Sequence, residues 1–180
     1  MAAVQQTVRI RGRALSVREG DIFVLQPDTV WSRMVSLVCG GWGHIVTIVL
    51  HQGRLMALSV YPPPCGLVIE PLQRFNSPSV TRLGLVRPRV PRTHTQTALL
   101  RVAVARLLQL HARDRRWAYD GPSEFLRSAL HLQAATESRY HCAELAARLA
   151  RAADAWPPGV TVSLPVHEVA RRVGDVRRLF

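Results

Sequence analysis

The sequence contains no lysine, because all 24 basic residues among its 180 are arginines. Twelve acidic residues leave a net charge of +12, which raises nucleic acid as a partner. The arginines are scattered, however, and aromatic residues make up only 6% of the chain, whereas a nucleic-acid-binding face gathers charge together with stacking aromatics. We therefore expect no specific nucleic-acid partner, and we attribute the exclusive use of arginine to a GC-rich coding bias.

Long apolar runs and cysteines are also scarce. No apolar stretch reaches the roughly 18 residues that span a membrane, and residues 1–13 lack the apolar segment of a secretory signal. The three cysteines, Cys39, Cys65 and Cys142, are odd in number and lack metal-ligand spacing, which argues against a disulfide framework or a structural zinc site. We expect a cytoplasmic protein as synthesised, with Cys39 in the core and Cys65 as a free surface thiol.

What the sequence does contain suits one folded domain. Hydrophobic residues make up 48% and charged residues 20% of the chain, which is a globular composition, and the length fits a single domain. We predict an irregular N-terminal lead-in over residues 1–18, followed by one domain over residues 19–180 that acts as a monomer.

The first half of this domain is predicted to be β-structure. Short apolar or β-branched runs bounded by turn residues predict five strands: Ile22–Leu25, His44–Leu50, Leu55–Val60, Gly66–Glu70 and Thr81–Val86. The second of these runs is apolar on both faces, which predicts a sheet that is covered on both sides. A helix is predicted over Val30–Val38, with a cap at Asp28 or Thr29.

The second half is predicted to be helical. Thr93 and Gln96 form a capping box, and the helix that follows carries an apolar stripe at Leu99, Val102, Ala103, Leu107 and Leu110. A shorter helix is predicted over Ser123–Leu132, and another begins at a Ser138 cap and carries Cys142. A small sheet followed by helices defines an α+β domain.

Two residues are candidates for chemistry. Cys142 is expected in the first turn of its helix, where the dipole favours an anion and a thiol is activated as a nucleophile. His44 begins a strand and could accept the thiol proton. From the residues alone, a small core cysteine and a structural histidine remain alternatives. The other six histidines, His141 among them, have weaker contexts, and Glu144 and Arg148 are expected on the helix face opposite Cys142.

Six segments stand in a fixed order along residues 19–170: Gly20–Leu25 with Trp42–Val49, Gly66–Leu72, Leu85–Pro88, Trp117–Asp120, Tyr140–Leu145 and Pro165–Ala170. They resemble the GDI…HVGIV, GV…PL, VxRP, xPYD, YxCSEL and PxDLA motifs of the permuted papain-like (NlpC-type) cysteine amidase/peptidase family, the YaeF/YiiX group. The resemblance implies a circularly permuted papain-like α+β fold, in which a small antiparallel sheet or barrel packs against helices. The histidine strand precedes the cysteine helix here, as a permutation produces.

The resemblance also implies roles for individual residues. Cys142 matches the nucleophile and His44 the general base and acid. The position that orients the imidazole falls at Ser59, where the family usually has glutamate; a hydroxyl can orient the ring but cannot stabilise imidazolium as a carboxylate would. Tyr119 and Tyr140 are implied to line the cleft, and the backbone N–H of Cys142 is a candidate donor to the oxyanion.

We therefore expect a cysteine hydrolase that cleaves amide bonds in peptide or cell-wall substrates through an acyl-enzyme, with no metal or organic cofactor. Three alternatives stay open. One is a lipid-ester hydrolase or acyltransferase, and a second is an antibacterial effector that is exported without a signal peptide and held by an immunity protein. A third is a degenerate module that only binds a partner, because Ser59 replaces the expected acid. The lipid alternative draws on an apolar helix around Trp31, Met34, Val35 and Val38.

Overall fold

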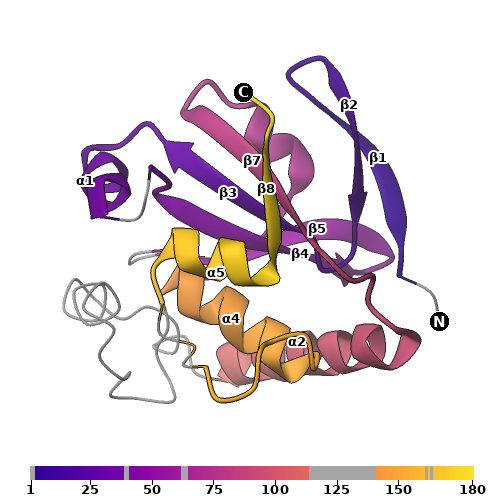
Figure 1. The fold of residues 1–180 in the computed structure, drawn as a ribbon. Helices are drawn as coiled ribbons and strands as arrows, with labels where there is room; N and C mark the ends of the chain where they lie inside the picture. The colour runs from indigo at the N-terminus through magenta and orange to yellow at the C-terminus, as the bar shows by residue number, and fades with distance from the viewer. Residues whose placement is uncertain (1–2, 39–40, 62–64, 114–140, 161, 163) are drawn as a thin grey trace.

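The computed structural model describes residues 3–38, 41–61, 65–113, 141–160, 162 and 164–180. Its centre is a six-stranded antiparallel sheet in the order β6-β5-β4-β3-β7-β8 (Figure 1). The five predicted strands are all found, each extended by one to three residues, and β8 at the β7 edge is a sixth strand that the sequence did not predict. The strands are β3 (Ile22–Pro27), β4 (His44–His51), β5 (Arg54–Tyr61), β6 (Gly66–Pro71), β7 (Val80–Pro88) and β8 (Gly174–Arg178).

The first 18 residues differ from the expectation of an irregular lead-in. Strands β1 (Gln5–Ile10) and β2 (Arg13–Arg18) form an antiparallel hairpin. Arg11 and Gly12 between them both have positive φ, at 47° and 76°, as the favoured two-residue hairpin turn requires. Apolar side chains from both strands enter the core: Val8, Ile10, Leu15 and Val17. The arginines between these residues alternate with them and face solvent, and this alternation was the signal that sequence reasoning missed.

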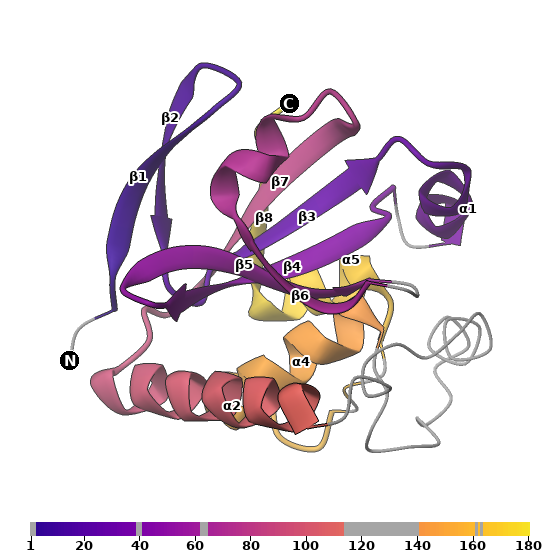
Figure 2. The same cartoon turned by 180° about the vertical axis from the view of Figure 1, so that it is seen from behind.

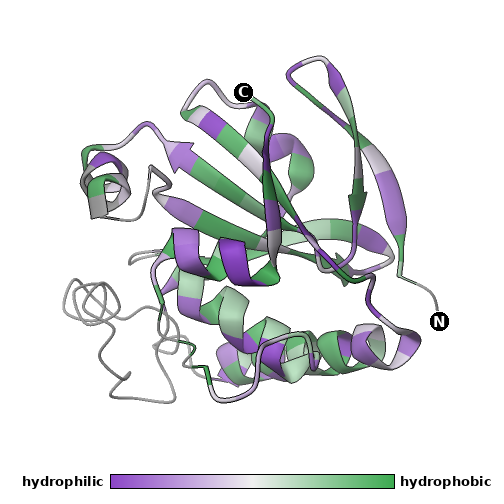
Figure 3. Ribbon diagram, in the orientation of Figure 1, coloured by the Kyte–Doolittle hydropathy of each residue, from purple (hydrophilic) through white to green (hydrophobic). Residues whose placement is uncertain are grey.

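Both faces of the sheet are covered, as the apolar run of β4 predicted. One face packs against the hairpin and a short 3₁₀ helix, Leu72–Asn76. The other packs against α4 (Cys142–Ala152), α5 (Val166–Val173) and α2 (His94–Arg113), which Figure 2 shows from behind. The central strands are largely apolar along their length, as the green ribbon in Figure 3 indicates. Helix α1 (Val30–Val38) matches its predicted bounds and leads from β3 to the start of β4.

Helix α2 begins as predicted but buries a different face. Thr93 and Gln96 make both hydrogen bonds of the capping box, at 3.0 and 3.2 Å. The predicted apolar stripe was right for Leu107 but wrong for Leu99 and Val102, which are 41% and 65% exposed. The buried side chains are Thr97, Leu100, Val104 and Leu107. Within the described residues, no helix combines the length and the apolar character that crossing a membrane would need.

Two buried acids explain the Gly-Asp motif that precedes β3. The Glu19 carboxylate accepts two hydrogen bonds from Arg101 of α2, at 2.9 and 2.7 Å, and Asp21 accepts from Arg87 of β7 at 3.0 and 3.3 Å. Gly20 between them has a φ of 86°, and a Cβ there would collide with the Arg92 guanidinium. Glu19 therefore links the start of β3 to α2, and Asp21 links it to the neighbouring strand β7.

Candidate functional site

The site begins with His44, the first residue of β4. Its side chain is buried, and its Nε2 lies 3.0 Å from the Ser59 hydroxyl on β5. The same hydroxyl donates to the carbonyl of Ile45 at 2.9 Å. Because that hydroxyl has one proton, the network assigns the proton of the imidazole to Nε2 and leaves the lone pair on Nδ1. Burial lowers the pKa of His44 to about 4, so the imidazole is neutral at pH 7.

Tyr61 covers the flat face of the same imidazole. The two rings stack with their centroids 4.5 Å apart and an angle of 28° between planes. Ser59 and Tyr61 are two residues apart on β5, so their side chains project from one face of the strand. The Tyr61 hydroxyl donates to Glu70 of β6 at 2.5 Å. Burial, followed by the Glu70 carboxylate, raises the pKa of Tyr61, so the phenol stays protonated.

Cys142 is the first residue of α4, as the first-turn prediction required. Its N-terminal cap is His141, whose Nδ1 accepts a hydrogen bond from the backbone N–H of Glu144 at 3.3 Å. From the sequence, His141 had only a weak context among the histidines, and nothing indicated that it caps this helix. The ring is buried, and burial lowers its pKa to about 4. The predicted cap Ser138 lies outside the described residues.

Cys142 lies at the end of the sheet where β4 starts. The residue is partly exposed and packs against two apolar clusters, one of which includes Ile45 and the other Val60. These residues adjoin His44 and Tyr61 in sequence. A negative charge on Cys142 is a further cause, after burial and Glu70, of the raised pKa of Tyr61. The thiol, the imidazole and the phenol therefore belong to one end of the molecule.

The helix that carries Cys142 is held by a buried ion pair. Glu144 is fully buried, and Arg148 donates to its carboxylate at 2.9 Å and lies 2.8 Å from it through a second nitrogen. The pair was expected on the helix face opposite Cys142, and the structure shows that Glu144 on that face is buried. Both partners lie on α4, so the pair compensates the buried carboxylate within the helix itself.

The remaining predicted residues divide into two groups. Cys65 is an exposed free thiol, as expected. Tyr119, Tyr140 and Cys39 lie outside the described residues, as does the predicted helix over 123–132. Among the described residues, no three His, Cys, Asp or Glu side chains gather as a metal-ligand set. Sequence reasoning missed Tyr61 and Glu70, although the two-residue spacing from Ser59 places Tyr61 on the same face.

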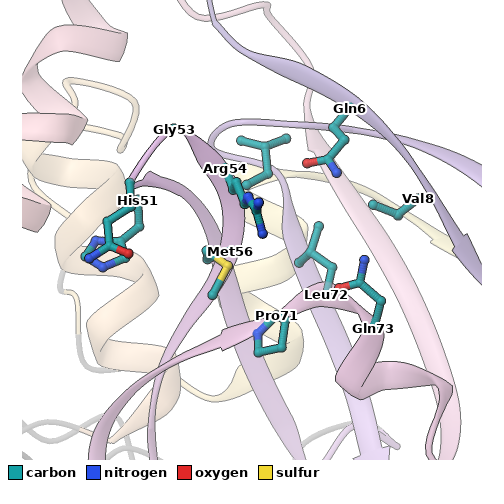
Figure 4. A pocket seen from close by; sticks show the side chains of 11 residues that line it. Gln6, Val8, His51, Gly53, Arg54, Met56, Pro71, Leu72 and Gln73 are labelled. Carbon is teal, nitrogen blue, oxygen red and sulfur yellow. The ribbon is translucent and has the colours of Figure 1, made fainter.

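A hollow of about 650 Å³ lies elsewhere, at the β4–β5 turn. Figure 4 shows its lining, which includes Gln6, His51, Arg54, Met56 and Gln73. His51 ends β4 and His44 begins it, so the hollow is about 23 Å along the strand from the imidazole. It is not part of the candidate site.

Comparisons with known proteins relate the chain to one fold. No protein-family model matches it, and neither does any curated protein. The crystal structure of the metalloprotein yiiX from Escherichia coli O157:H7 is similar to it, with a TM-score of 0.53 and 14% sequence identity. The match covers 88% of this chain and 87% of that one. The chain therefore has a YiiX-like α+β fold, in which an antiparallel sheet packs against helices.

Proposed function

We propose that this protein is a cysteine hydrolase of circularly permuted papain-like type, in which Cys142 attacks an amide carbonyl and His44 moves the proton. The observation that carries the proposal is the contact of Ser59 with Nε2 of His44 at 3.0 Å. It leaves Nδ1 of a neutral, buried imidazole with a lone pair, which is the state a general base needs.

The position of Cys142 supports its role as the nucleophile. It is the first residue of α4, where the helix dipole and unpaired N–H groups favour a thiolate over a thiol. The residue is partly exposed and not sealed in the core. Cys142 packs with Ile45 and Val60, and successive side chains of a strand point to opposite faces, so the mechanism requires the thiol to reach the imidazole past the strand ends, where β4 starts.

The reaction follows from these groups. The thiol proton moves from Sγ to Nδ1 of His44, and the thiolate electron pair forms a bond to the carbonyl carbon. The backbone N–H of Cys142 donates to the resulting oxyanion. The C–N bond then breaks, and the amine leaves with the proton that Nδ1 held. Water attacks the acyl-enzyme with Nδ1 again as base, the C–S bond breaks, and Sγ regains its proton.

The yiiX neighbour is described as a metalloprotein. The described residues of this chain do not offer a matching set of His, Cys, Asp and Glu side chains, and every step above passes through the chain's own groups. Peptide or cell-wall amides are the proposed substrates, because the family that the sequence motifs resemble acts on such bonds.

One observation favours a second substrate class, the acyl esters of lipids. Val30 and Leu37 of α1 are 77% and 86% exposed, and α1 leads directly into β4 and His44. Exposed apolar side chains beside a site can hold an acyl chain. Assays of the purified protein on peptide anilides and on 4-nitrophenyl esters of increasing chain length separate the two classes. A rate that grows with chain length favours the ester, and a Val30→Ser, Leu37→Ser variant should then lose that growth.

The test of the nucleophile is the rate of alkylation of each cysteine. Arginine spacing places Cys39, Cys65 and Cys142 in three different tryptic peptides, 34–54, 55–74 and 140–148, so mass spectrometry reads each cysteine separately. We expect iodoacetamide at pH 7 to modify Cys142 at least about tenfold faster than Cys65, the internal control for an exposed thiol. His44→Gln should remove that advantage. Equal rates in the unaltered protein would reject the hydrolase and leave the binding module.

A further inference from the structure

The imidazole of His44 has a chemical difficulty that Ser59 does not solve. During turnover the ring takes up a proton while buried, and a buried imidazolium is costly. The Ser59 hydroxyl orients the ring but is neutral, and it is already engaged with the carbonyl of Ile45. A carboxylate in its place would compensate the charge. A group other than Ser59 therefore has to stabilise the positive charge of the protonated imidazole.

Such a group lies against the flat face of the imidazole. Tyr61 lies against it with a centroid distance of 4.5 Å, within the range over which an aromatic ring attracts a cation. The interplanar angle of 28° keeps the two faces together. Ser59 at the ring edge and Tyr61 on the ring face thus fix both the rotation and the tilt of the imidazole.

The family that the motifs resemble usually has a glutamate at the position of Ser59. In this chain a glutamate lies on the next strand of the sheet. Glu70 of β6 accepts the hydrogen bond of the Tyr61 hydroxyl, and a phenol that donates to a carboxylate has a more electron-rich ring. The register pairs Tyr61 with Gly66 and Ala57 with Glu70, so Tyr61 and Glu70 project from the same face of the sheet. Arg74 lies 3.6 Å from the other oxygen of Glu70.

We propose that Tyr61 is a positioning residue for His44, whose ring face stabilises the imidazolium that forms when the thiol gives up its proton, and that Glu70 strengthens this effect through the phenol. The inference rests on the proposed function, because it concerns the proton that Cys142 transfers. Among the described residues, the charged and titratable groups around the phenol are Glu70, Cys142 and Arg74. Of these, only the Glu70 carboxylate bonds to the phenol.

The test follows the alkylation rate of Cys142 from pH 5 to pH 10. Tyr61→Leu removes the aromatic face, and we expect its rate at pH 7 to fall about three- to tenfold. Tyr61→Phe keeps the aromatic face but loses the hydrogen bond to Glu70. Glu70→Gln keeps that hydrogen bond but loses the negative charge. In each variant the alkylation rate of Cys142 at pH 7 should fall about twofold. Above pH 9, where the thiol ionises without help from His44, all variants should equal the unaltered protein.

A matched control separates this role from mere packing. Phe75→Leu truncates a buried aromatic residue that packs on Phe23, so it lowers the thermal midpoint without touching His44 and should leave the pH profile unchanged. If Cys142 is fast in the unaltered protein and all Tyr61 and Glu70 variants match it at pH 7, the role of Tyr61 is overturned and the hydrolase stands. If Cys142 reacts no faster than Cys65 from the start, both proposals are overturned.

Discussion

At the scale of single residues, the hydroxyl of Ser59 decides which nitrogen of His44 carries the proton. It donates to one backbone carbonyl and therefore accepts from Nε2. In neutral imidazole the other nitrogen is then the acceptor. The Ser59 hydroxyl thus orients the imidazole, as a carboxylate at this position would. The sequence indicated the position of Ser59 but could not show its hydrogen bond to His44.

Ser59→Ala should free the imidazole to adopt the wrong tautomer. We expect the rate of Cys142 alkylation at pH 7, and of any hydrolysis found, to fall about tenfold, because a positioned base contributes at least that much. Thr47→Val is the matched control. Thr47 Oγ1 is buried on the neighbouring strand and has no hydrogen-bond partner among the described residues, so its loss removes a hydroxyl without touching His44. Equal effects of the two variants would contradict the assignment.

At the scale of the element, α4 has a neutral cap beside Cys142, the proposed nucleophile. Aspartate is a common cap, but its charge would lie one residue from the Cys142 sulfur and oppose the thiolate. His141 accepts the N–H of Glu144 and stays uncharged because burial lowers its pKa to about 4. The helix end keeps its positive dipole for the thiol.

Substitutions of His141 separate capping from charge. Asparagine and aspartate both cap helices well, so His141→Asn and His141→Asp should have similar thermal midpoints. Only the aspartate should move the pH midpoint of Cys142 alkylation upward, by about 0.5–1 pH unit, since a nearby negative charge raises a thiol pKa. Identical pH profiles for the two variants would show that the charge of the cap does not reach the sulfur.

At the scale of the whole molecule, two buried neutral histidines make stability depend on pH. Both His44 and His141 have folded-state pKa values of about 4 against 6.5 in the unfolded chain. A depressed histidine pKa means that the unfolded chain binds more protons between pH 6.5 and 4. The contribution to stability is therefore complete above pH 6.5 and is lost as the pH falls through this window.

Urea unfolding at pH 7, 6 and 5 measures this dependence. We expect each histidine to lower the free energy of unfolding by up to about 1.4 kcal/mol per pH unit within the window. His141→Asn should roughly halve the slope, because one titrating group is gone. A free energy of unfolding that stays constant from pH 7 to pH 5 would contradict the buried, neutral state of both rings.

The sequence predicted the elements that have strong local signals. The β-branched run from His44, the capping box at Thr93 and Gln96, and helix α1 all appeared within a residue or two of their expected bounds. Where local signals were ambiguous, prediction failed. Helix α2 has apolar residues around much of its circumference, so periodicity could not decide that Leu100 is buried and Val102 exposed.

What the sequence determined by itself was the α+β order and the positions of Cys142, His44 and Ser59, because strand runs, caps and spacing are properties of neighbouring residues. The contact between His44 and Ser59 was decided by the tertiary structure. The stacking of Tyr61 on His44, the link to Glu70 and the burial of His141 each depend on strand register and on which helix covers which face. Such pairings join residues far apart in the chain, and many alternative pairings suit the same local pattern.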